Sequence, residues 1–354
     1  MVGPEPTALP LGDTPAYWSF YILPYFFKKC YNGLNMAKKK TFTKEELQSL
    51  SAGEINRKII YENYSLLRSL GAEDLRKEMV PVGKVCKMAV NHFVNSTGPK
   101  NDYEKHSRNA RKKMVKGLSK IAPGEYKGFP KDTKNGLVVG FNHPSLGEIG
   151  RIMMMKADVM GDSLMLFPVN LPWYEALAPF YDKIKMLGII ITPTITPATW
   201  EKMKLKKGTA LYEAGNRIKH EFRDMYTDLS HETIKNGGVI FVAPSATRQA
   251  KVFKTPEVYE GKEPIIPTMS LLALRLYRDP EMKCDFLPMA VLPPDGYKRG
   301  LNIRKKYKLI PGKPMTADYI REKYFKGSIP DKLDGFDYEF HQRIADELPK
   351  SFWY

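Results

Sequence analysis

The sequence predicts an α/β protein with a mixed, largely parallel sheet flanked by helices, together with an N-terminal helical subdomain. Four short apolar runs carry this prediction, at residues 136–141, 187–192, 238–243 and 286–292. Continuous runs of this kind are typical of strands that are buried on both faces. Amphipathic stretches that could form helices lie between the runs, at residues 148–160, 198–226 and 268–277. Strands that alternate with helices indicate a sheet covered by helical layers.

The chain divides into three predicted regions. Residues 1–42 form an N-terminal segment whose aromatic run, residues 16–31, is followed by basic residues. This segment could lie on a membrane surface or pack its rings into a groove of the protein. Residues 43–125 show helical spacing, including a helix over residues 103–118, and residues 126–354 contain the predicted strands. We therefore expect a helical subdomain followed by the α/β domain.

The charge of the chain limits its partners more than its composition does. Its 354 residues carry a formal net charge of +17, which favours anions such as nucleic acid, lipid headgroups, phosphorylated metabolites or an acidic carrier protein. Cys30, Cys86 and Cys284 are few and far apart, which argues against a disulfide framework and indicates a reducing compartment. No apolar run is long enough for a transmembrane helix.

A histidine and a carboxylate follow the first predicted strand. His143 comes just after it, Pro144 suits the first helical position, and Glu148 lies in the early turns of that helix. At this spacing the carboxylate can hold one imidazole nitrogen and leave the other as a general base. The alternative is a structural histidine beside a glutamate that interacts with the helix dipole. Ser145 is interpreted as a residue of the first helical turn, because its surroundings do not form a Gly-x-Ser-x-Gly elbow.

A second segment follows the predicted strand at residues 238–243. Its small residues, including Ser245, let a ligand approach the backbone, and the planar fork of Arg248 matches a phosphate. Taken alone, the segment is better explained as an ordinary turn with a solvated arginine. Functional residues of such sheets lie at the carboxyl ends of strands, so the two segments together predict a site for an anionic ligand.

These segments resemble blocks of the glycerolipid acyltransferase superfamily, and most closely its soluble plastid-type glycerol-3-phosphate acyltransferases. Asn142-His143 followed by Glu148 is similar to the family block Asn-His-x-x-x-x-Asp, with glutamate in place of aspartate. Ala243-Pro244-Ser245 with Arg248 is similar to the third block of the plastid-type enzymes. The resemblance covers about residues 130 to 295.

Two further blocks are similar in part. Leu287-Pro288-Met289 is similar to the fourth block, a strand that contains a proline. The second block keeps its strand, but Thr192-Pro193-Thr194 stands where the family carries a basic residue that helps to bind phosphate. Either another basic residue replaces it, with Lys183, Lys185, Lys202 and Lys204 nearby in sequence, or the acceptor differs from glycerol 3-phosphate.

The resemblance implies an O-acyltransferase that moves a fatty acyl group from acyl carrier protein or acyl-coenzyme A to the hydroxyl of glycerol 3-phosphate. It implies that His143 is the general base, that Glu148 orients it, and that Arg248 binds the acceptor with Ser245, Thr247 and Lys251. The thioester is a co-substrate, and neither a cofactor nor a metal is implied. The expected location is the cytoplasm or plastid stroma, with an anionic membrane surface as a further partner.

Two alternatives stay open at this point. The acceptor could be 1-acylglycerol 3-phosphate or another lipid hydroxyl, collected by the aromatic N-terminal segment. In a different class, the chain could be a basic protein without activity that binds membranes or nucleic acid, as the basic residues 108–116 and 299–308 suggest. We do not expect nucleic acid, because no nucleic-acid-reading motif accompanies these residues.

Overall fold

The computed structural model describes most of residues 124–353 and five helical positions between residues 109 and 116, all in one compact unit of the chain. Within 124–353 the residues outside the description are 132, 145–147, 162, 172–173, 175–183, 185–186, 203, 246–266 and 296–305. The predicted N-terminal segment, residues 1–42, lies outside the described residues. So does the predicted helical subdomain, residues 43–125, apart from the five helical positions and its last two residues.

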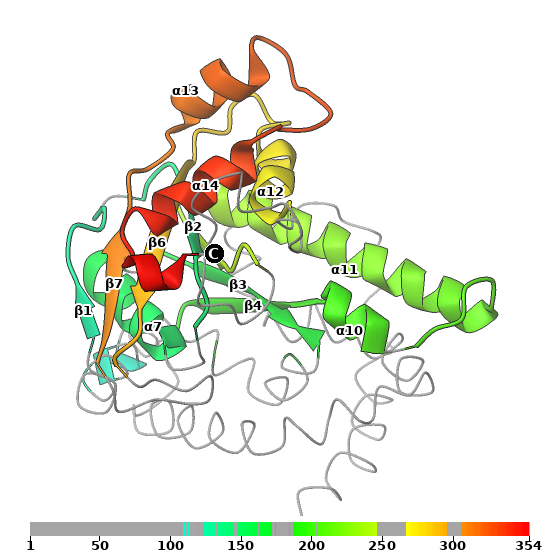
Figure 1. The fold of residues 1–354 in the computed structure, drawn as a ribbon, viewed down its shortest axis with the longest axis horizontal. Coiled ribbons are helices and arrows are strands. Elements are labelled where there is room, and N and C mark those ends of the chain that lie inside the picture. The colour runs from blue at the N-terminus through cyan, green and yellow to red at the C-terminus, as the bar shows by residue number, and fades with distance from the viewer. Residues whose placement is uncertain are drawn as a thin grey trace, which may run out of the picture. The chain divides into compact units, whose positions relative to one another are not determined.

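Seven strands form one sheet in the described part of the chain, in the order β1-β7-β6-β2-β5-β3-β4 (Figure 1). The strands are β1 (Gly124–Tyr126), β2 (Leu137–Phe141), β3 (Met165–Asn170), β4 (Ile189–Thr194), β5 (Val239–Val242), β6 (Asp285–Leu292) and β7 (Tyr307–Pro311). Neighbouring strands are parallel except β6 and β7, which are antiparallel. The predicted α/β class with a mixed, largely parallel sheet is confirmed.

Helices cover both faces of this sheet. They are α7 (Glu148–Val159), α10 (Pro197–Lys202), α11 (Ala210–Lys235), α12 (Thr268–Leu276), α13 (Ala317–Ile320) and α14 (Phe336–Ala345), with the short helices η3 (Arg321–Phe325) and η4 (Lys350–Phe352). Among the described residues, no helix combines the length and the apolar character needed to cross a bilayer.

The alternation of side chains along β2 divides the core into two layers. Leu137, Val139 and Phe141 pack with the apolar face of α7, whereas Val138 belongs to the cluster that includes α11, α12 and α14. Gly140 also faces this second layer, because a Cβ atom there would lie 2.4 Å from Cε1 of Phe340 in α14. The strand is buried along its whole length, as its continuous apolar sequence predicts.

The crossovers explain why the helices separate in this way. From β2 the chain passes through α7 to β3, on one side of β2, and it later returns through α11 to β5. Right-handed crossovers that move in opposite directions along a sheet place their helices on opposite faces. α7 and α11 do lie on opposite faces (Figure 1). From β5 the chain continues through α12, on the α11 side, to β6 on the far side of β2.

The structure corrects one predicted helix. The stretch at residues 198–226 is not a single helix, because α10 ends at Lys202 and α11 begins at Ala210. Gly208 has a φ of +82° and Lys204 a φ of +50°, a left-handed backbone that no helix can continue through. The Thr209 side chain then caps α11 by accepting a hydrogen bond from the Tyr212 N–H.

Candidate active site

The two predicted functional segments lie on neighbouring strands. β2 and β5 are parallel, with Gly140 paired to Val242, so both strands end at the same edge of the sheet. The chain leaves β2 toward α7 on one face and leaves β5 toward α12 on the opposite face. Adjacent strands whose connections diverge in this way form a topological switch point, where open α/β sheets commonly bind ligands.

His143 stands at this edge, two residues after β2, and contacts the carboxylate predicted from the sequence. Its Nδ1 atom is hydrogen-bonded to Oε1 of Glu148, the first residue of α7. The Glu148 side chain is fully buried, whereas 16% of the His143 side chain is exposed. With Glu148 ionised, Nδ1 donates the hydrogen bond, so Nε2 carries the lone pair that can accept a proton. The pair therefore has the connectivity of a base and its orienting carboxylate.

Asn142 fixes the backbone that carries His143. Its side-chain amide donates to the carbonyl oxygen of Val291 at 3.0 Å and accepts from the Val291 N–H at 2.6 Å. Val291 lies in β6, the other neighbour of β2, and Asn142 is buried. The side chain thus continues the β2–β6 ladder beyond the last backbone pair, Phe141 and Met289. The sequence places Asn142 beside His143. The role of Asn142 could not be predicted from this, because it depends on which strand lies next to β2.

The second predicted segment is described only in part. Pro244 is buried directly after β5, and Ser245 is partly exposed next to it. The other predicted ligands of the acceptor, Thr247, Arg248 and Lys251, lie outside the described residues. Their binding roles stay predictions.

A polar cluster occupies the same edge of the sheet where the family's second block would lie. Asn170, the last residue of β3, exchanges hydrogen bonds of 2.7 and 2.9 Å with the Thr199 hydroxyl, which also lies 3.1 Å from the Thr196 hydroxyl. These neutral groups satisfy one another, so they do not replace the missing basic residue. Lys204, one candidate for that replacement, is exposed in the turn between α10 and α11.

One charged residue near the site was missed by the sequence reasoning. Arg151 lies one helical turn after Glu148 and is fully buried. A charged residue is almost never fully buried without a partner. The sequence does contain a signal for this burial. The helical spacing of α7 places Arg151, the residue before Ile152, on the side of the helix that faces the core.

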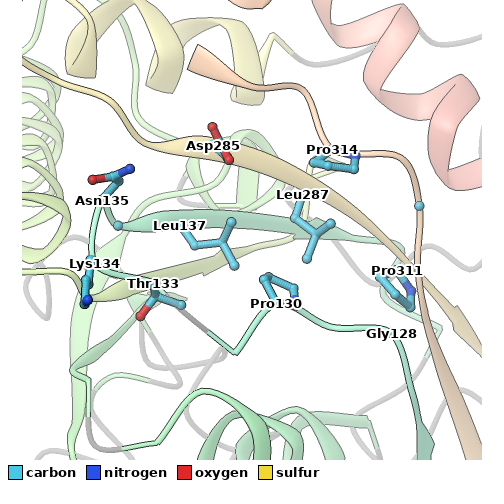
Figure 2. Close-up of a pocket in the computed structure, with 12 residues that line it drawn as sticks. Gly128, Pro130, Thr133, Lys134, Asn135, Leu137, Asp285, Leu287, Pro311 and Pro314 are labelled. Atoms are coloured by element: carbon cyan, nitrogen blue, oxygen red, sulfur yellow. The ribbon is translucent and has the colours of Figure 1, made fainter. Parts of the chain in front are cut away.

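A separate cleft of about 540 Å³ lies at the opposite end of the sheet. Leu137 and Leu287 line it near the beginning of β2 and β6, together with Asp285, Pro130 and Pro311 (Figure 2). Burial raises the pKa of the Asp285 carboxyl, and the hydrogen bond from the Ala317 N–H acts in the opposite direction. Because His143 follows the carboxyl end of β2, this cleft does not belong to the predicted site.

Comparison with known proteins assigns no family to the chain, since no family model matches it and no curated protein is significantly similar to it. Within the described residues, no group of three or more histidine, cysteine or acidic side chains is placed to bind a metal ion. The geometry of the switch point is therefore the basis for assigning a function.

Proposed function

We propose that the chain is an O-acyltransferase that moves a fatty acyl group from a thioester to a hydroxyl, with His143 as the general base. The observation that carries the proposal is the His143–Glu148 hydrogen bond at the edge shared by β2 and β5. Its carboxylate is buried and its imidazole is accessible, which suits proton transfer to and from a bound substrate.

The proposed reaction requires one group to accept and then return a proton. Nε2 of His143 takes the proton of the acceptor hydroxyl as the oxygen attacks the thioester carbonyl carbon. The tetrahedral intermediate then breaks its carbon–sulfur bond, and the imidazolium returns the proton to the departing thiolate. Glu148 keeps Nδ1 protonated and stabilises the imidazolium between these steps. Ester and free thiol are the products.

The proposed acceptor is glycerol 3-phosphate, with 1-acylglycerol 3-phosphate as the alternative. Arg248 and its neighbours Ser245, Thr247 and Lys251 would bind the phosphate, because they follow in sequence the end of β5, which pairs with β2 at the edge where His143 stands. The proposed donor is acyl carrier protein or acyl-coenzyme A, whose negative charge complements the net charge of +17. An anionic membrane surface is a further proposed partner, consistent with the same charge.

The test is release of free thiol from acyl-coenzyme A and acyl carrier protein donors in the presence of each acceptor. His143→Ala should lower kcat by about 10²- to 10⁴-fold, the usual contribution of a general base. Glu148→Gln should also lower kcat, because the neutral amide no longer stabilises the imidazolium. His220→Ala is the matched control, since His220 is an exposed histidine of α11. Full activity of His143→Ala would refute the mechanism.

The acceptor is tested separately. Arg248→Ala should raise the KM for the phosphorylated acceptor at least about tenfold and leave the KM for the donor nearly unchanged, as expected for a charged hydrogen bond. Arg217→Ala, which removes an exposed positive charge from α11, is the control for a general loss of charge. Salt-sensitive binding to anionic vesicles or nucleic acid without any acyl transfer would favour the non-catalytic alternative.

A further inference from the structure

α7 buries an arginine directly behind the proposed catalytic pair. Arg151 follows Glu148 by one turn, so both side chains leave the same side of the helix. Both residues are fully buried. The stem of Arg151 passes over β1 at a glycine, because a Cβ atom on Gly124 would lie 2.9 Å from its Cγ atom. Its guanidinium carbon lies 4.7 Å from the centre of the Tyr307 ring.

β1 and β7 form the site that accepts this side chain. Gly124 and Tyr307 are paired residues of these two strands, so one provides space for the stem and the other an aromatic face for the cation. Tyr307 is itself fully buried. A cation–π contact that is desolvated in this way contributes about 2 kcal/mol, which does not offset the several kcal/mol that burial of a cation costs.

Glu148 contributes to the compensation of this buried cation. Burial lowers the pKa of Arg151, whereas the nearby Tyr307 and Glu148 both raise it. The Glu148 carboxylate therefore interacts with two groups, the His143 imidazole through a hydrogen bond and the Arg151 guanidinium through its charge. Each of the two buried charges reduces the cost of burying the other.

We propose that Arg151 is a positioning residue: its guanidinium supports the buried Glu148 carboxylate as the charged partner that holds the imidazole of His143, and it opposes uptake of a further proton by the His143–Glu148 pair. The charged and titratable groups that act on the guanidinium include Tyr307 from β7 and Glu148 from α7 itself. Without the guanidinium, the buried carboxylate beside the imidazole would lose a positive charge that helps to compensate it, which favours uptake of a proton by the pair. This inference rests on the proposed function only in its consequence for activity.

The decisive measurement needs no substrate. The ring signals of His143, identified by their loss in His143→Ala, are followed by NMR as a function of pH in the native chain and in Arg151→Met. Methionine keeps an unbranched stem and removes the charge. We expect the pair to take up its proton at a pH about one unit higher, a tenfold change in proton affinity. Arg151→Lys, which keeps the charge, should restore most of the native value.

Lys156→Met is the matched control. Lys156 is a second buried cation of α7, but its Nζ atom donates to the carbonyl oxygen of Gly161 at 2.9 Å, away from Glu148. Its replacement should lower stability without moving the His143 titration. If Arg151→Met does not fold, Arg151→Gln removes the charge and keeps a polar side chain for the same comparison. A folded neutral variant with the native titration would overturn the proposal and leave Arg151 a structural residue.

Activity separates this proposal from the proposed function. If His143 is the base, Arg151→Met should lower kcat by up to about tenfold at pH values below both titrations, recover at higher pH, and change the acceptor KM little, since one pH unit corresponds to a tenfold shift in protonation. A shifted titration combined with an active His143→Ala variant would keep the Arg151–Glu148 coupling and refute the acyltransferase mechanism. An unshifted titration combined with an inactive His143→Ala variant would refute the Arg151–Glu148 coupling and keep the acyltransferase mechanism.

Discussion

Replacing Asn142 with alanine should lower the free energy of unfolding by about 2 to 6 kcal/mol, because two buried polar groups lose their partner. The N–H and the carbonyl oxygen of Val291 are bonded to the Asn142 amide at 2.6 and 3.0 Å. Each buried group left unpaired costs about 1 to 3 kcal/mol, and the burial of Asn142 limits replacement by water. Urea denaturation followed by tryptophan fluorescence gives this value directly. A loss below about 1 kcal/mol would contradict the ladder role.

Asn142→Asp tests the same reasoning with a side chain of equal size. The carboxylate still accepts from the Val291 N–H but faces the Val291 carbonyl oxygen without a hydrogen to donate. Its pKa in the folded chain should therefore lie above the unfolded value of about 3.9, so the variant is most destabilised at neutral pH. As the pH falls through this folded-state pKa, the carboxyl becomes protonated and can donate to the Val291 carbonyl oxygen. The difference in stability between the variant and the native chain should then narrow. A gap that is independent of pH would refute the hydrogen-bond assignment.

Two further predictions concern the layer that covers β2 on the α14 side. Gly140→Ala should cost about 1 to 3 kcal/mol through overpacking, because the added Cβ atom would lie 2.4 Å from Cε1 of Phe340. Phe340→Leu in the same chain should recover part of that loss, and a native urea midpoint for Gly140→Ala would contradict the close approach. Burial lowers the pKa of His341 to about 4, below the value of about 6.5 expected in the unfolded chain. The unfolded chain then binds this proton more tightly, so stability should fall by up to about 3 kcal/mol between pH 6.5 and 4. His341→Gln should flatten that part of the stability profile; an unchanged slope assigns it to other groups.

The sequence was informative where one short pattern determines the outcome. β2, β4, β5 and β6 are continuous apolar runs, and each was predicted within a few residues of its observed bounds. β3 was missed because Pro168 interrupts it and its last three residues are only partly buried. β7 was missed because exposed Lys308 breaks its apolar character.

The same distinction applies to the candidate site. The contact between His143 and Glu148 follows from local spacing at a helix start, so it could be predicted from one segment. The roles of Asn142 and Arg151 depend on contacts with Val291 and Tyr307, which are distant in sequence. Such contacts depend on the order of the strands in the sheet, and the apolar runs that predict the strands do not define this order. Arg248 has no described position, and its role is still a prediction from the sequence.

The place of β5 in the sheet also sets an order of assembly. Among the described strands, β2 pairs only with β5 and β6, and both come much later in the chain. β5 also separates β2 from β3, although these two strands are consecutive in sequence. During synthesis, β2 therefore leaves the ribosome long before either partner exists, with its apolar faces uncovered and its backbone N–H and C=O groups unpaired. Long-range pairing of this kind slows folding and favours aggregation in the interval. A nascent chain that ends before Val239 contains His143 and Glu148 but not the completed edge at which they stand.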